Sequence, residues 1–132
     1  QYIVERGERF IAIKPFASRY EWEVHILPLH HRSSFLEITE ADRNDLARVL
    51  KRTMIRLDAV IGGAQYNLFL HAKPSGDEYA DCDASYHWHL EICPRTSIPT
   101  GFELGSGLFV STISPEEAAE RLRSVNLDEE HA

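Results

Sequence analysis

Apolar and polar side chains alternate along the first thirty residues in the way that β-strands require. The stretches "QYIVE" and "RFIAIK" flank an Arg-Gly-Glu tripeptide, residues 6–8, which is typical of a β-hairpin in which Gly7 takes a turn conformation that other residues avoid. Apolar residues then recur at every second position of "EWEVHILPL": Trp22, Val24 and Ile26. A period of two that is followed by Pro28 predicts a third strand.

Between residues 39 and 63 the period changes to that of an α-helix. One apolar stripe follows the helical spacing: Leu46, Val49, Leu50, Met54, Leu57, Val60 and Ile61. Thr39 is a suitable N-cap with Asp42 at the capping-box position, and Gly62-Gly63 supply a C-terminal stop. The segment is therefore predicted to be one long helix that buries a single face.

The second half of the chain returns to strand patterns and ends in a short helix. Strands are predicted at residues 66–71 and 86–93, a short sixth strand at residues 108–113, and turn-rich connections at residues 72–85 and 94–107. Ser114 as N-cap and Pro115 at the first helical position start the last helix, and residues 126–132 are expected to fray. This order predicts one α+β domain, residues 1–132, in which a long helix packs on one face of an antiparallel sheet.

Composition narrows the class of protein. A net charge of −7 without a basic cluster argues against nucleic acid and anionic membranes as partners, and no apolar run is long enough to span a bilayer. The two cysteines, Cys82 and Cys93, lack a C-x-x-C spacing. They are predicted to be free thiols in a reducing compartment, hence in the cytoplasm, and the alternative is that one of them is a metal ligand. Because the chain starts with Gln1 in strand-like sequence, we expect it to be a piece of a longer protein.

The fifth predicted strand, within "SYHWHLEICPR", carries the candidate chemistry. Its apolar positions share one face and are expected to point into the core: Tyr86, Trp88, Leu90 and Ile92. Its polar positions share the other face: His87, His89, Glu91 and Cys93. If the fourth and fifth strands pair antiparallel, His71 adds a third imidazole. Such a group can bind one metal ion or present nitrogens to a phosphate, and the plain alternative is a polar strand face in solvent.

Two levels of family resemblance follow from these motifs. "YHWHLEICPR" resembles the H-φ-H-φ-H-φ-φ-P-R segment of the histidine-triad (HIT) superfamily, φ being apolar, and "VHILPLHHR", "FLEITEADRNDLARVL" and "YNLFL" resemble its strand, helix and Asn-bearing strand. Together with "GFELGSG" and "SPEEAAERLR", the segments "PFASRYEWEVHILPLHH" and "YHWHLEICPR" resemble the C-terminal half of galactose-1-phosphate uridylyltransferase. The resemblance runs from about residue 9 to residue 123 and implies a HIT-like fold.

This resemblance implies a transferase of two HIT-like halves. Such an enzyme takes UMP from UDP-glucose onto a histidine, releases glucose 1-phosphate and passes the UMP to galactose 1-phosphate, which is covalent catalysis. The nucleophile lies in an H-P-H-x-Q motif of the N-terminal half, and this sequence contains no such motif. The chain is therefore expected to need an N-terminal catalytic half as a partner and to be inactive alone.

The resemblance also implies roles for individual residues. His71, His87 and His89 match three ligands of a structural zinc or iron site, whose fourth ligand is a glutamate of the N-terminal half. Phe102 and Glu103 match a pair that contacts the sugar across a homodimer, with Glu103 accepting hydrogen bonds from hydroxyls. Two positions depart from the pattern: Ser97-Ile98 replaces a Lys-aromatic pair, and Glu91 stands where a simple histidine-triad enzyme has its third histidine.

Two alternatives remain open from the sequence. In a stand-alone histidine-triad nucleotide hydrolase or transferase, His89 would be the catalytic nucleophile, and Asn67 and the loop near Arg95 would position the phosphate of the substrate. Metal binding and nucleophilic attack compete for the same nitrogen of His89, so these two hypotheses exclude each other there. The third possibility is a non-catalytic, metal-binding dimerisation module.

Overall fold

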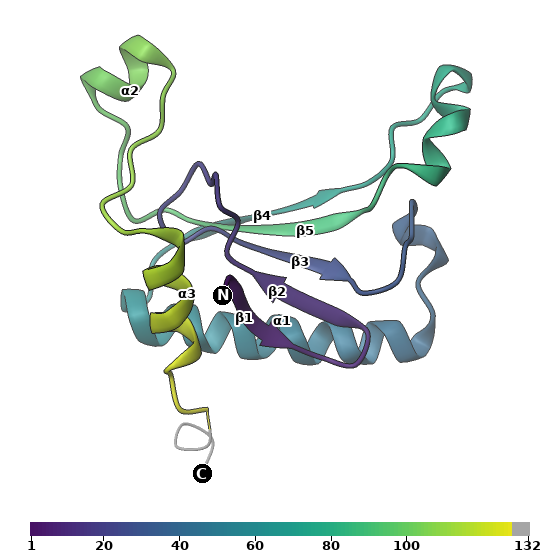
Figure 1. Ribbon diagram of the computed structural model, residues 1–132, viewed down its shortest axis with the longest axis horizontal. Helices are drawn as coiled ribbons and strands as arrows, with labels where there is room; N and C mark the ends of the chain where they lie inside the picture. The colour runs from purple at the N-terminus through teal and green to yellow at the C-terminus, as the bar shows by residue number, and fades with distance from the viewer. Residues whose placement is uncertain (128–132) are drawn as a thin grey trace.

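A five-stranded antiparallel sheet with helices on one face forms the body of the protein, as the computed structural model shows for residues 1–127 (Figure 1). The strands are β1 (Ile3–Arg6), β2 (Phe10–Ile13), β3 (Val24–Pro28), β4 (Tyr66–His71) and β5 (His89–Pro94). They lie in the order β1-β2-β3-β5-β4. Strands β1 and β4 are therefore the two edges of the sheet. The expected fraying of residues 126–132 falls largely outside the described residues.

The helices begin and end at the residues that the capping signals indicated. In α1 (Glu40–Ile61), the Thr39 side chain and Asp42 form a reciprocal capping box, and Gly62 closes the helix in the left-handed conformation with φ 72°. The Ser114 side chain caps α3 (Pro115–Arg123) by accepting from the backbone N–H of Glu117. Two shorter helices lie in the predicted connections, η2 (Asp77–Ala84) and α2 (Gly101–Ser106), and a third, η1 (Phe35–Glu37), precedes α1.

The core lies between one face of the sheet and helices α1 and α3. The buried sheet residues are Val4, Phe10, Ala12, Val24, Ile26, Leu90 and Ile92, and Trp88 joins them from the segment just before β5. The buried helix residues are Leu46, Val49 and Leu57 of α1, and Ala118, Ala119 and Leu122 of α3. The predicted α+β class, with one long helix packed on a sheet face, is confirmed. No helix among residues 1–127 combines the length and apolar character that crossing a bilayer needs.

Three sequence-based element predictions need correction. The strand β3 begins at Val24 rather than at Trp22, which lies in a turn but stays buried, and β5 begins at His89 rather than Tyr86. The backbone N–H of Trp88 instead donates to the backbone carbonyl of Arg32, a residue that lies outside any strand. Residues 108–113 form no strand and pair with none of the described strands. Leu108, Phe109 and Val110 are exposed, and Ile113 packs partly buried against the core.

Gly7 is needed in the first hairpin for a reason other than the one its turn suggested. Its φ is not positive, but a Cβ at this position would collide with the Asp45 carboxylate of α1. That carboxylate accepts backbone N–H groups from Arg9 at 2.8 Å and Phe10 at 3.1 Å. The hairpin is thus hydrogen-bonded directly to the helix. Only glycine, which has no side chain, lets the hairpin backbone come this close to Asp45.

Candidate metal centre

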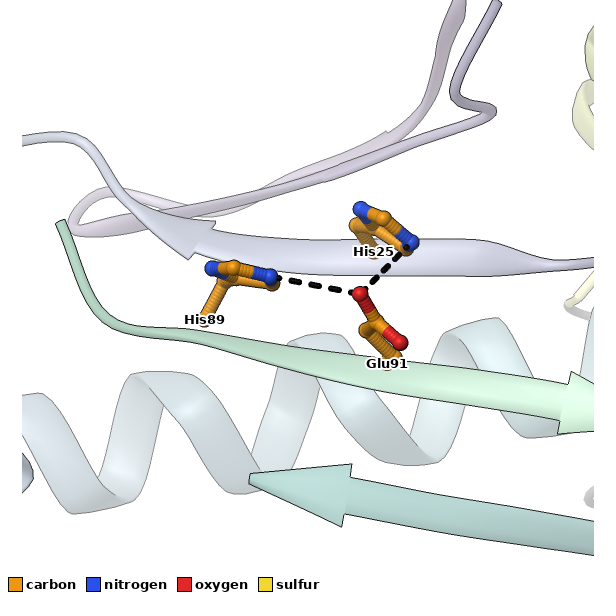
Figure 2. Close-up of side chains that lie close together, drawn as sticks. All are labelled: His25, His89 and Glu91. Atoms are coloured by element: carbon orange, nitrogen blue, oxygen red, sulfur yellow. Dashed lines mark hydrogen bonds and ion pairs between the residues drawn. The ribbon is translucent and has the colours of Figure 1, made fainter. Parts of the chain in front are cut away.

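Adjacent strands bring histidine and glutamate side chains together on the sheet face opposite α1, and Figure 2 shows His25 of β3 beside His89 and Glu91 of β5. His25 of β3 lies opposite Glu91 of β5 in the antiparallel register, and His71 of β4 lies opposite His89 of β5. Because side chains alternate along β5, the residues between these polar positions point into the core. The buried Trp88, Leu90 and Ile92 therefore hold the strand in place and leave its other face available for chemistry.

The carboxylate of Glu91 is at the centre of this group. Its Oε1 lies 3.4 Å from Nε2 of His25 and 3.3 Å from Nε2 of His89 (Figure 2), and its Oε2 lies 3.1 Å from Nε2 of His71. The ring of His89 stacks on both other imidazoles, with centroid distances of 5.0 Å to His71 and 5.4 Å to His25. We call these four residues the Glu91 cluster: His25, His71, His89 and Glu91.

A second carboxylate borders the cluster. Oε1 of Glu23 lies 2.8 Å from Nε2 of His25, and Oε2 of Glu23 accepts backbone N–H groups from Arg19 and Tyr20. Burial acts to raise the pKa of Glu23, but the hydrogen bonds from His25 and the two backbone groups outweigh it and hold the pKa below its ordinary value. The site therefore combines two carboxylates with three imidazoles.

A hollow of about 370 Å³ opens beside these side chains, lined by residues that include Glu23, His25, His71, Glu91 and Cys93. Cys93 contributes a buried thiol, whose pKa burial raises to about 11. Glu23, Glu91 and Cys93 also present donor atoms within 4.8 Å of one another. The thiol stays protonated at neutral pH, so the carboxylates supply the negative charge of the hollow.

The structure brings two of the three predicted metal ligands together and places the third elsewhere. His71 and His89 both belong to the Glu91 cluster. His87 precedes β5, its Nε2 lies 2.8 Å from the backbone carbonyl oxygen of Pro28, and its ring packs on His31. His25 is the residue that sequence reasoning missed, because only the register of β3 against β5 reveals its position.

The predicted substrate contacts lie away from the cluster or at its margin. Asn67 is exposed on the edge strand β4, opposite Cys93. Phe102 is 59% exposed on α2, which sits at the end of an arm that projects from the sheet (Figure 1). Oε2 of Glu103 accepts hydrogen bonds from the backbone N–H and the hydroxyl of Thr100, and these bonds lower the pKa of Glu103.

Comparison with known proteins decides the family. The family model described as "Galactose-1-phosphate uridyl transferase, C-terminal domain" matches residues 1–132, the whole chain. The chain belongs to this family.

Relatives of this C-terminal domain include enzymes with two different names. The chain is 29% identical over 127 residues to an ADP-glucose phosphorylase of Arabidopsis thaliana, covering 96% of the chain and 36% of that protein. It is 30% identical over 132 residues to galactose-1-phosphate uridylyltransferase of Thermotoga maritima, covering 95% of the chain and 41% of that protein. The chain thus spans about two fifths of the length of these curated relatives.

Solved structures show the same relationship. A crystal structure of the Arabidopsis thaliana ADP-glucose phosphorylase with bound ADP-glucose matches 96% of the chain and 41% of its own chain, with a TM-score of 0.84 and 28% identity. A HIT-like protein of Bartonella henselae and a zinc-bound histidine triad family protein of Mycobacterium smegmatis match with TM-scores of 0.65 and 0.61 at 14% and 17% identity. At these identities the likeness shows the fold, and the predicted HIT-like fold is confirmed.

The donor set of the uridyl transferase C-terminal domain fits a zinc or iron ion. The ligand atoms of His25, His89 and Glu91 all lie within 4.8 Å of one another. Two donors that bind a tetrahedral zinc ion at about 2.0–2.2 Å lie about 3.3–3.6 Å apart. The distances from Oε1 of Glu91 to His25 and His89, 3.4 Å and 3.3 Å, come close to this spacing. His71 contacts the other oxygen of the carboxylate and lies outside this group of three donors. Imidazole nitrogens and a carboxylate oxygen are ligands that both metals accept.

Lys14, buried at the end of β2, is expected to give the domain a characteristic pH dependence. Its ammonium donates to the hydroxyl of Ser18 and to the carbonyl of Tyr20, but burial lowers its pKa from 10.5 to about 8 against the opposing effect of Glu23. Between these two pKa values the unfolded state binds more protons, so the unfolding free energy gains up to about 1.4 kcal/mol per pH unit as the pH rises.

The measurement is urea unfolding between pH 7 and pH 9.5, with Lys14→Met as the matched variant that lacks the titrating group. The unfolding free energy of the wild type relative to this variant should increase above pH 8. A difference that stays constant over this range would show that the Lys14 ammonium is not destabilised in the fold.

Proposed function

We propose that the chain is the C-terminal domain of a two-domain nucleotidyltransferase that moves a nucleoside monophosphate between UDP-glucose and galactose 1-phosphate. The match of the family model to all 132 residues carries this proposal. The length of the relatives supports a missing N-terminal half as a partner, since the chain spans 36% and 41% of them. In that half a histidine would form the covalent nucleotidyl intermediate, and this chain would complete the site.

The role proposed for the open sheet face is to hold a structural zinc or iron ion. His71 and His89 are the predicted ligands whose nitrogens face one carboxylate, that of Glu91. His87, the third predicted ligand, would have to give up its contact with Pro28 to join them. When bound, the ion supplies positive charge that links the ends of β4 and β5. The chain's own residues orient the donors: Glu23 and Glu91 fix the imidazole of His25 from either side.

The projecting arm is proposed to supply the sugar contacts. Phe102 offers an exposed aromatic face, and Glu103 uses only Oε2 in its hydrogen bonds with Thr100, which leaves Oε1 to accept from a sugar hydroxyl. Apolar side chains are exposed along the arm and on the edge strand β4: Leu68, Phe69, Leu70, Ile98, Leu104, Leu108, Phe109 and Val110. We assign these surfaces to contacts with the N-terminal half and with a second subunit of a homodimer.

The surroundings of His89 argue against the stand-alone hydrolase. Its Nε2 faces Glu91 and its Nδ1 lies 3.2 Å from the backbone carbonyl of His87, while its ring is stacked between two imidazoles. An incoming phosphate would meet the Glu91 carboxylate next to the nucleophile, and like charges repel. Cys82 and Cys93 are both free thiols, which supports the proposed cytoplasmic location.

Two assays test the proposed function. One uses the protein that includes its N-terminal half, and the other uses the 132-residue chain alone. The two-domain protein should convert UDP-glucose and galactose 1-phosphate to glucose 1-phosphate and UDP-galactose, and the isolated chain should show no turnover. ADP-glucose with inorganic phosphate is the second substrate pair, because the chain is similar to an ADP-glucose phosphorylase. Glu103→Gln should lower kcat/KM of the two-domain protein about 10- to 100-fold, the value of a hydrogen bond to a charged group.

Glu120→Gln is the matched control, since Glu120 is an exposed glutamate of α3. UDP-glucose cleavage by the isolated chain that disappears in His89→Ala would establish the stand-alone alternative instead. A folded, metal-containing two-domain protein that turns over neither substrate pair would support the non-catalytic dimerisation module.

A further inference from the structure

A second hollow, of about 280 Å³, lies between the end of β1 and the middle of α1, on the side of the sheet that α1 covers. Its lining residues are Glu5 and Arg6 of β1 and Arg48, Val49 and Arg52 of α1. Arg48 and Arg52 are four positions apart and therefore project from the same side of the helix. Strands β2 and β3 separate β1 from β5, so this hollow is distinct from the Glu91 cluster. Three guanidinium groups thus line one hollow in a chain whose net charge is −7.

The carboxylates beside the hollow are already used within the fold. Oε1 of Glu5 accepts from Nε of Arg52 at 3.1 Å, and its Oε2 accepts from Nε and Nη2 of Arg56 at 2.9 Å and 2.8 Å. The Asp45 carboxylate pairs with Arg48 and accepts backbone N–H groups of the first hairpin. Both oxygens of each carboxylate therefore have partners, and these contacts hold Arg48 and Arg52 in position from one side.

Guanidinium donors are left over for a ligand. Arg6 is exposed, and among residues 1–127 no group forms a hydrogen bond or an ion pair with it. Arg52 uses only Nε in its contact with Glu5, and Arg48 uses only Nη2 in its contact with Asp45. Their other N–H groups remain unused, and the two side chains are 43% and 55% exposed, so a molecule from solvent can reach them.

We propose that this arginine hollow, lined by Arg6, Arg48 and Arg52, binds a small phosphate-bearing anion. Guanidinium forks match pairs of phosphate oxygens, and here three of them converge from two elements that carboxylates fix in place. Four arginines outnumber the three carboxylates around them: Arg6, Arg48, Arg52 and Arg56 against Glu5, Glu8 and Asp45. The volume lies below the range of about 300–1,000 Å³ that is usual for larger ligands, which favours a small anion.

The test is isothermal titration calorimetry of the 132-residue chain with pyrophosphate at low ionic strength, since salt screens exposed charges. We expect saturable binding of one pyrophosphate per chain. Arg6→Gln and Arg52→Gln should each weaken it by at least about 10-fold, the effect of losing a hydrogen bond between charged groups. Arg6→Lys keeps the charge but lacks the fork, and it should weaken binding by about threefold or more.

Two further titrations distinguish the sources of the phosphate group. Tighter binding of pyrophosphate than of glucose 1-phosphate indicates an inorganic ligand, and the reverse order indicates a phosphate ester; either result supports the arginine hollow as a phosphate site. A hexaglutamate peptide that binds more tightly than both would assign this surface to an acidic protein segment and overturn the proposal.

Arg43→Gln is the matched control, because Arg43 is an exposed arginine of the same helix that lies outside the hollow. Thermal unfolding of each variant checks that the fold is retained, and Arg6→Gln removes no contact of the fold. Equal weakening in Arg43→Gln, or unchanged pyrophosphate binding in both Arg6→Gln and Arg52→Gln, would show that the arginine hollow is not a phosphate site. This titration does not involve turnover, so its failure and that of the proposed function are distinguishable.

Discussion

His89→Ala is expected to weaken Zn(II) and Co(II) binding by more than about 100-fold while leaving the domain folded. His89 lies at the centre of the stacked imidazoles and faces Glu91 at 3.3 Å, so its removal opens the middle of the cluster. The side chain lies on the open face of the sheet, and the fold loses only its contacts within the cluster and with the carbonyl of His87. The unfolding free energy of the metal-free chain should therefore change by about 1 kcal/mol or less.

Elemental analysis after gentle purification measures the bound ion, and Co(II) titration measures the affinity. His30→Ala is the control, since His30 is an exposed histidine outside the cluster. A His89→Ala variant that keeps its full metal content would exclude this cluster as the metal centre. If that variant also lost nucleotide hydrolysis, His89 would instead be a nucleophile.

Trp88→Ala, one position earlier in the chain, is expected to lower the unfolding free energy by about 3–5 kcal/mol. Trp88 is 1% exposed, its ring lies 5.7 Å from that of Phe10 and meets Phe35 edge to face at 5.0 Å. Alanine leaves a cavity between the sheet and the segment before α1, and the rigid sheet cannot collapse to fill it. Urea unfolding at neutral pH measures the loss.

Trp88→Phe is the matched variant because it keeps an aromatic ring against both neighbours. The indole N–H of Trp88 has no hydrogen-bond partner among the described residues, so phenylalanine removes a buried donor that contributes nothing. Its cost should be less than half that of alanine. Equal costs for the two variants would mean that the hydrogen-bonding capacity of the indole, rather than ring packing, stabilises the core.

Trp88, just before β5, and His89, its first residue, thus have different expected effects: His89 acts on ion binding and Trp88 on folding. The assignment of these residues to the open face or to the core was predictable from the sequence. Successive side chains alternate faces, and the apolar set Trp88, Leu90 and Ile92 marks the buried face. The long helix and its ends were predictable for a similar reason. Capping and periodicity are local, and Thr39, Asp42 and Gly62 act within the helix that they delimit.

The start of β5 and the role of Gly7 were not correctly predicted from the sequence. The alternation of polar and apolar residues extends back to Tyr86 and His87, but backbone pairing starts only at His89 with β4 and at Leu90 with β3. Gly7 looked like a turn residue, and its actual constraint is the carboxylate of Asp45, which lies on a helix that starts more than thirty residues later. Both outcomes depend on contacts between segments distant in the chain.

The sequence by itself determined the family, the sheet-and-helix architecture and the face on which His89 and Glu91 lie, because motif, period and caps are written in consecutive residues. Only the tertiary structure decided which histidines meet. The register of β3 and β4 against β5 placed His25 and His71 beside Glu91, while the turn before β5 directed His87 toward Pro28. A periodic pattern specifies the face of a strand, but the relative shift of two strands is set by packing and hydrogen bonding across the whole sheet.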